Sequence, residues 1–168
     1  GCVMLKLGIE SGSQAVLDKL NKGIDVETAS RVLTRLHRAG IASYGYFLFG
    51  TPAETEDTAR ETLRFIARNG SAMGFMNLAL FNLPAFGPES DELETRDFYE
   101  GDLALYRDFE HPLGWNRDRV RIFLDRTVKR HPTVAAVLRR EPPSFGSSHA
   151  PLFAMAWKRS GENEFMPS

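Results

Sequence analysis

Two polar segments of the chain stand where apolar runs end, and their residue types could bind a nucleoside. Glu10-Ser11-Gly12-Ser13 places a carboxylate after a strand-like run and backbone N–H groups at a predicted helix start. A carboxylate there can accept two hydrogen bonds from a ribose diol, while a helix N-terminus favours an anionic or electron-rich group. The alternative is structural, with Ser11 and Ser13 capping a helix and Glu10 solvated. Lys22 ends that helix and could reach back to the carboxylate, although a solvated lysine is the commoner case.

The second segment is Gly50-Thr51-Pro52-Ala53-Glu54-Thr55. Its backbone amides could meet an adenine edge, but strand-to-helix turns without a ligand use the same residue types. A third segment, residues 82–88, offers an aromatic side chain and glycine for stacking on a planar ring, and is weak evidence alone.

The elements around these segments alternate between strand-like and helix-like patterns, which is typical of parallel βα units. Strands are predicted over Val3–Ile9, Ile41–Phe49 and Ala72–Phe81. The helices between them are predicted to begin at the capping residues Ser13, Asp25 and Thr55. Ligands of parallel α/β folds bind at the carboxyl ends of the strands, so we expect the polar segments to gather at one edge.

Beyond the loop over residues 82–94 the pattern becomes mainly helical. Helices are predicted over Gly101–Phe109, Asn116–Arg130 and, capped by Thr133, Val134–Arg140, whereas Ser147–Trp157 is apolar without a clean period and Lys158–Ser168 is a polar tail. The arginines of the second helix could bind phosphate or RNA, but interspersed aspartates favour a solvated face. His149 stands between small residues and could be held at a site, although a packed or solvated histidine is the commoner case.

Composition limits the function classes. The 168 residues are 42% hydrophobic and 26% charged, enough for a globular domain with a sizeable core. A net charge of -1 favours neither nucleic acid nor an anionic membrane. The single cysteine, Cys2, excludes an internal disulfide and a site of several thiolates in this chain. No apolar stretch approaches a membrane span and the N-terminus does not resemble a signal peptide, so a cytoplasmic location is expected.

Three βα units leave long sheet edges uncovered. This favours a missing N-terminal half of a parent protein as the partner. The alternative is that the C-terminal helices, or a second copy of the chain in a homo-oligomer, cover the exposed edge.

Taken together, the motifs resemble the later strands of the radical S-adenosylmethionine (SAM) barrel, in particular the branch fused to a cobalamin-binding domain. The resemblance rests on the ordered motifs Leu7-Gly8-Ile9-Glu10-Ser11-Gly12-Ser13, Leu20-Asn21-Lys22-Gly23, Ala39-Gly40-Ile41 and Phe49-Gly50-Thr51-Pro52-Ala53-Glu54-Thr55-Glu56-Asp57. It implies an α/β fold in which residues 1–94 form the C-terminal half of a partial (β/α)6 TIM-like barrel. Residues 95–168 would be a mainly helical C-terminal extension.

The resemblance also implies roles for individual residues. Glu10, with Ser11 beside it, would bind the SAM ribose, and Lys22 would pair with the SAM carboxylate. Leu48 and Gly50 match an apolar-x-Gly motif near adenine, and Tyr46 stands where many members have glycine. Two residues after the third strand, Leu83 and Pro84, would close over the nucleoside. No catalytic or metal-ligating residue is expected in this chain.

The function implied is a fragment of a radical SAM iron–sulfur oxidoreductase, inactive alone because the CxxxCxxC motif is absent. SAM would be the cofactor, with a 4Fe-4S cluster and possibly cobalamin in the parent protein. A second hypothesis is a non-catalytic nucleoside-binding or scaffolding module. A third, ranked last, is an α/β enzyme that uses Glu10 and His149, since no nucleophile–base pair is evident.

Overall fold

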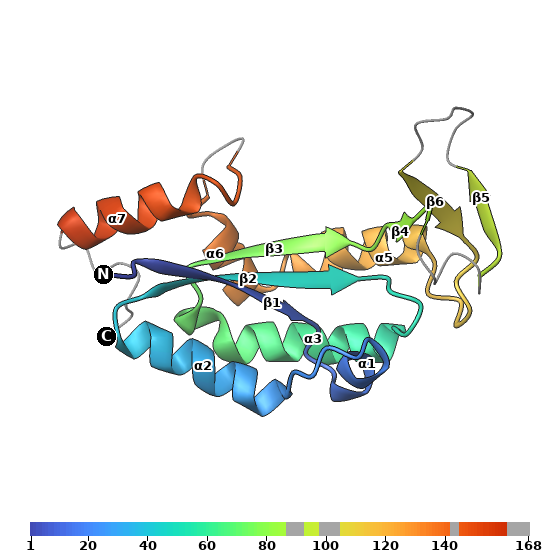
Figure 1. Cartoon of the computed structure of the whole chain (residues 1–168), viewed down its shortest axis with the longest axis horizontal. Helices are drawn as coiled ribbons and strands as arrows, with labels where there is room; N and C mark the ends of the chain where they lie inside the picture. The colour runs from blue at the N-terminus through green and yellow to red at the C-terminus, as the bar shows by residue number, and fades with distance from the viewer. Residues whose placement is uncertain (87–92, 98–104, 142–144, 161–168) are drawn as a thin grey trace.

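A parallel three-stranded sheet forms the centre of the computed structural model, which describes residues 1–86, 93–97, 105–141 and 145–160 (Figure 1). The strands are β1 (Met4–Glu10), β2 (Ala42–Phe49) and β3 (Phe75–Leu80), in the order β1-β2-β3. The predicted α/β fold with three parallel strands is confirmed. Its membership of a partial barrel stays a prediction, because these strands form an open sheet.

Helices α1 (Gln14–Lys19), α2 (Val26–Arg38) and α3 (Glu56–Asn69) connect the strands, and the 3-10 turn η1 (Gly70–Ala72) precedes β3. Two of the three predicted caps are confirmed. Asp25 accepts a 2.6 Å hydrogen bond from the Thr28 amide, and Thr55 forms a reciprocal pair with Thr58. Ser13 occupies the N-cap position of α1 as predicted, but its side chain makes no capping hydrogen bond.

The main core lies between the sheet and the layer of α2 and α3 (Figure 1). Alternate β2 residues, including Phe47 and Phe49, are buried against Phe65 and Ile66 of α3. Three C-terminal elements extend this core: α5 (Arg117–Phe123), the wider π-helical segment η2 (Leu124–Val128) and α6 (Pro132–Leu138). These three elements therefore share one core with the βα units. Helix α6 begins after His131 rather than at the predicted cap Thr133, because Pro132 favours the first helical position.

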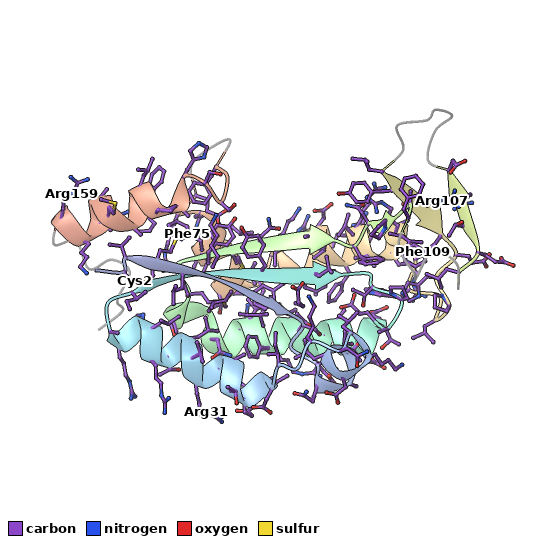
Figure 2. All side chains as sticks on the ribbon, in the orientation of Figure 1. Cys2, Arg31, Phe75, Arg107, Phe109 and Arg159 are labelled. Carbon is purple, nitrogen blue, oxygen red and sulfur yellow. The ribbon has the colours of Figure 1, made fainter. Side chains whose placement is uncertain are left out.

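The opposite face of the sheet is covered at the amino-terminal ends of its strands by α7 (Ala150–Ser160) (Figure 1). Phe75 lies beneath α7 (Figure 2). It packs there with Tyr44, Ala150 and Ala154, and the ring centroids of Phe75 and Trp157 are 4.9 Å apart. The sequence did not predict this helix. Its buried positions are small alanines while Leu152 and Met155 are exposed, and this arrangement hides the helical period.

A small antiparallel sheet stands beyond the carboxyl ends of the main strands (Figure 1). It consists of β4 (Leu83–Pro84), β5 (Thr95–Asp97) and β6 (Tyr106–Phe109), in the order β4-β6-β5. The predicted helix over 101–109 was wrong at 106–109, where cross-strand pairing with β4 and β5 determines the structure. Residues 101–104 lie outside the described part.

The predicted tail begins inside α7, and its residues 161–168 are also not described. No helix in the described ranges is long and apolar enough to cross a membrane.

Candidate functional site

An ion pair between Glu10 and Lys22 lies at the end of the edge strand β1. Lys22 Nζ is 3.2 Å from Glu10 Oε1, with side-chain exposures of 41% and 19%. The short helix α1 and a left-handed turn at Asn21 (φ 50°) bring the lysine back to the strand end. The structure therefore joins the two side chains that the sequence suggested could meet. Glu10 itself has φ 64°, a conformation that non-glycine residues rarely adopt and that is often found at functional sites.

The Glu10 carboxylate lies over the backbone of Gly8. A Cβ atom at Gly8 would stand 3.0 Å from Glu10 Oε1, so a larger residue there would push the carboxylate aside. Across the sheet Gly8 pairs with Tyr46, and Tyr46 pairs with Asn77. Paired residues of parallel strands share a face, and this one is opposite α2 and α3. The carboxylate, the phenol and the amide thus form a row across the open part of the sheet.

Leu48 and Ser11, two further predicted site residues, lie on different sides of the sheet. Leu48 is half-buried and pairs with Ala79 on the same face as Tyr46. Ser11 is instead buried, with its hydroxyl 3.0 Å from that of Thr62 on α3. It also accepts a bond from the Ser13 amide, so it anchors the loop to the helix layer.

Leu83 and Pro84 lie in the small antiparallel sheet. The Leu83 side chain is fully buried, whereas Pro84 is exposed. They pair with Arg107 and Tyr106 of β6. Of the two, only Pro84 has a surface that a ligand could touch.

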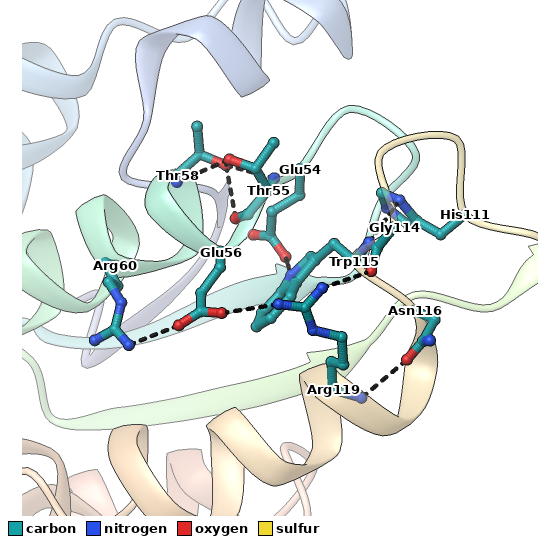
Figure 3. Close-up of polar contacts among 10 residues, drawn as sticks. All are labelled: Glu54, Thr55, Glu56, Thr58, Arg60, His111, Gly114, Trp115, Asn116 and Arg119. Carbon is teal, nitrogen blue, oxygen red and sulfur yellow. Dashed lines mark hydrogen bonds and ion pairs between the residues drawn. The ribbon is translucent and has the colours of Figure 1, made fainter.

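The turn after β2 is organised by Glu54, which the sequence analysis did not select. The Gly50 amide donates a 2.6 Å hydrogen bond to Glu54 Oε2, so this amide is not free for an adenine edge. The Trp115 indole N–H donates to the same oxygen at 2.9 Å (Figure 3). Glu54 is fully buried, and burial raises its pKa to about 7 even though both hydrogen bonds act in the opposite direction.

His111 supports this turn from the C-terminal segment. Its Nδ1 accepts from the amides of Leu113 and Trp115, so Nε2 carries the proton and donates to the Thr51 carbonyl at 2.8 Å. Burial lowers the pKa of His111 and favours the neutral ring.

His149 is not part of the strand-end site. Its Nδ1 accepts from the Gly146 amide at 3.0 Å in the turn before α7. Its ring lies near that of Phe145, which belongs to the aromatic cluster at the other end of the strands. The structure therefore does not bring together the pair Glu10 and His149. Nor do the described residues contain a group of three or more His, Cys, Asp or Glu side chains that could hold a metal ion.

Comparison with known proteins gives partial matches. The chain is 34% identical over 70 residues to bacteriochlorophyllide d C-12(1)-methyltransferase of Chlorobaculum tepidum, which is 41% of this chain and 15% of that protein. It is 31% identical over 65 residues to an uncharacterized methyltransferase of Pyrococcus horikoshii, 39% of this chain and 14% of the relative. An uncharacterized protein of Methanopyrus kandleri is 30% identical over 64 residues, with shares of 38% and 12%. The chain thus spans less than a sixth of each relative. No family model matches.

These relatives correct the function predicted from the sequence. Two of the three are named methyltransferases, and no name among them refers to a radical reaction, an iron–sulfur cluster or cobalamin. The assignment to the radical SAM superfamily, as a fragment of an iron–sulfur oxidoreductase, is therefore replaced by a methyltransferase-like relationship. The 4Fe-4S cluster and cobalamin have no support from these relatives.

Proposed function

We propose that this chain is part of a SAM-dependent methyltransferase and that its strand ends bind SAM. The observation that carries the proposal is the Glu10–Lys22 pair on the open face of the sheet, in a chain similar to named methyltransferases. In parallel α/β folds this edge of the sheet is where ligands bind.

The chemistry of the two side chains fits SAM. Glu10 Oε1 faces Lys22, and Oε2 makes no hydrogen bond within the described residues, so it can accept from a ribose hydroxyl. Lys22 is partly exposed and can pair with the ligand's carboxylate. The ligand's diol would donate hydrogen bonds to the Glu10 carboxylate, and its carboxylate would pair with Lys22. Each contact is charge-assisted.

When bound, SAM supplies an electrophilic methyl group on its sulfonium. The chain's own residues bind and orient it. Glu10 holds the ribose, Lys22 neutralises the carboxylate, and Leu48 and Tyr46 give an apolar surface that excludes water from the nucleoside. Pro84 contacts the ligand from the small sheet, while Ser11 and Gly50 support the loops from within.

The open sheet belongs to a partial barrel in this proposal. The edge strand β1 and the face that carries Tyr46 and Asn77 would be completed by further βα units, in the same polypeptide or in a partner. The methyl acceptor then binds over the same face.

Paired variants test the site. Glu10→Gln and Lys22→Met should each weaken SAM binding roughly ten- to a hundredfold in calorimetric titration, because each removes one charge-assisted contact. Glu27→Gln and Arg68→Met are the matched control, since this ion pair has the same 3.2 Å separation on the outer helices. The control should leave affinity unchanged. Wild-type affinity in both Glu10→Gln and Lys22→Met would refute the site.

A further inference from the structure

Glu54 joins two parts of the chain that are far apart in sequence. Its Oε2 accepts from the Gly50 amide just after β2. The same oxygen accepts from the Trp115 indole just before α5 (Figure 3). The residue is fully buried, so water does not compete for this oxygen. Without Glu54, the buried Trp115 N–H and the half-buried Gly50 N–H would lose their partner, which is costly.

The turn at Gly50 depends on this link. Gly50 has φ 82°, a left-handed conformation that suits glycine, and a Cβ there would lie 3.2 Å from Val120 Cγ2 of α5. The hydrogen bond from His111 to the Thr51 carbonyl fixes the next residue of the turn. The turn and the start of α5 therefore form one packed unit.

The end of β2 leads directly into this unit. The Phe81 amide donates to the Phe49 carbonyl at 2.8 Å, which is the last bond between β2 and the chain beyond β3. Leu48, on the ligand-facing side, stands two residues before Gly50. A loosened turn would let this strand end fray and would move Leu48 relative to Glu10.

We propose that Glu54 is a positioning residue for the nucleoside end of the SAM site. It does not touch the ligand. It holds the Gly50 turn against Trp115 and so places Leu48 and Tyr46 beside Glu10. The inference rests on the proposed function, because it assigns Glu54 to that same site.

Three variants test the inference in the whole chain. Glu54→Ala removes the shared acceptor and should weaken SAM binding about tenfold. Glu54→Gln keeps an acceptor oxygen and should restore affinity to within about threefold of wild type. Val134→Ala, a buried core change on α6 away from the turn, should lower stability while leaving affinity near wild type.

Amide hydrogen exchange gives a readout that does not need the ligand. Glu54→Ala should speed exchange at Leu48 to Gly50, whereas Val134→Ala should not do so selectively. Wild-type SAM affinity in Glu54→Ala, or an equal loss in Val134→Ala, overturns the positioning role. A wild-type chain that binds no SAM defeats the proposed function instead, and unaltered exchange at the turn defeats the inference by itself.

Discussion

The buried carboxyl of Glu54 should make the stability of the chain depend on pH. Burial raises its pKa from 4.5 to about 7, so the folded chain holds a proton that the unfolded chain releases. Stability should therefore fall as pH rises from about 4.5 to about 7 and then level off, with a total loss of about 3 kcal/mol. Glu54→Gln removes this titration.

Urea unfolding of wild type and Glu54→Gln at several pH values between 4.5 and 8 measures the difference between their free energies of unfolding. His111 acts in the opposite direction, because its lowered pKa costs stability as pH falls below 6.5, and subtracting the variant from wild type cancels that contribution. The free energy of unfolding of wild type minus that of Glu54→Gln should fall steadily as pH rises to about 7. A difference that is constant with pH would mean that Glu54 is ionised at ordinary pH in the folded chain.

Sequence reasoning predicted a contact between residues that are close in the chain and missed contacts between residues that are distant. Lys22 follows Glu10 by one short helix, so their meeting depends only on local geometry. The link from Glu54 to Trp115 spans 61 residues, and no spacing pattern predicts it. Glu54 follows the Gly50-Thr51-Pro52 turn, and nothing in that local sequence distinguishes a buried glutamate from a solvated one.

At the scale of elements, the helix caps differ in what they contribute. The Thr55 hydroxyl accepts from the Thr58 amide while the Thr58 hydroxyl accepts from the Thr55 amide, so α3 begins with two satisfied donors. Thr55→Ala should cost about 1 kcal/mol of unfolding free energy. Ser13→Ala should change stability by less than about 0.5 kcal/mol, because the buried Ser13 hydroxyl makes no hydrogen bond in the described residues. Chemical denaturation measures the free energy of unfolding of both variants. Similar losses in the two would show that local sequence alone determines cap strength.

The strands and helices of the βα region were predictable because each has its own period and its own terminating residues. The helices predicted over 116–130 and 134–140 also exist, as α5 with η2 and as α6. Strand β6 and helix α7 were not predicted, because neighbours in space determine them. Strand β6 exists through pairing with β4 and β5, and its four residues carry no strand signal strong enough to prevail over a helical interpretation. Helix α7 buries alanines against an aromatic cluster and exposes Leu152, which removes the expected stripe.

For the whole molecule, the two edges of the sheet differ. The β3 edge lies beside α5 and α6, and the Met76 amide donates to the carboxylate of Glu141 at 3.4 Å. No strand in the described ranges pairs with the outer edge of β1. Helix α7 covers only one end of the open face, so no described element covers the β1 edge or the rest of that face.

An unpaired strand edge is a template for association, and we expect the isolated chain to self-associate through β1 as its concentration rises. Leu5, near the start of β1, is 41% exposed. Leu5→Lys should raise the dissociation constant of the self-association about tenfold, because a charge on an edge strand opposes pairing. Leu152→Lys is the matched change, since Leu152 is 64% exposed on α7 and lies away from the edge. Sedimentation velocity over a concentration series measures both variants. Equal effects would place the contact on α7 or elsewhere, and a monomeric wild type at every concentration would show that the edge is protected without a partner. Selective weakening by Leu5→Lys would identify β1 as the surface where the sheet is extended.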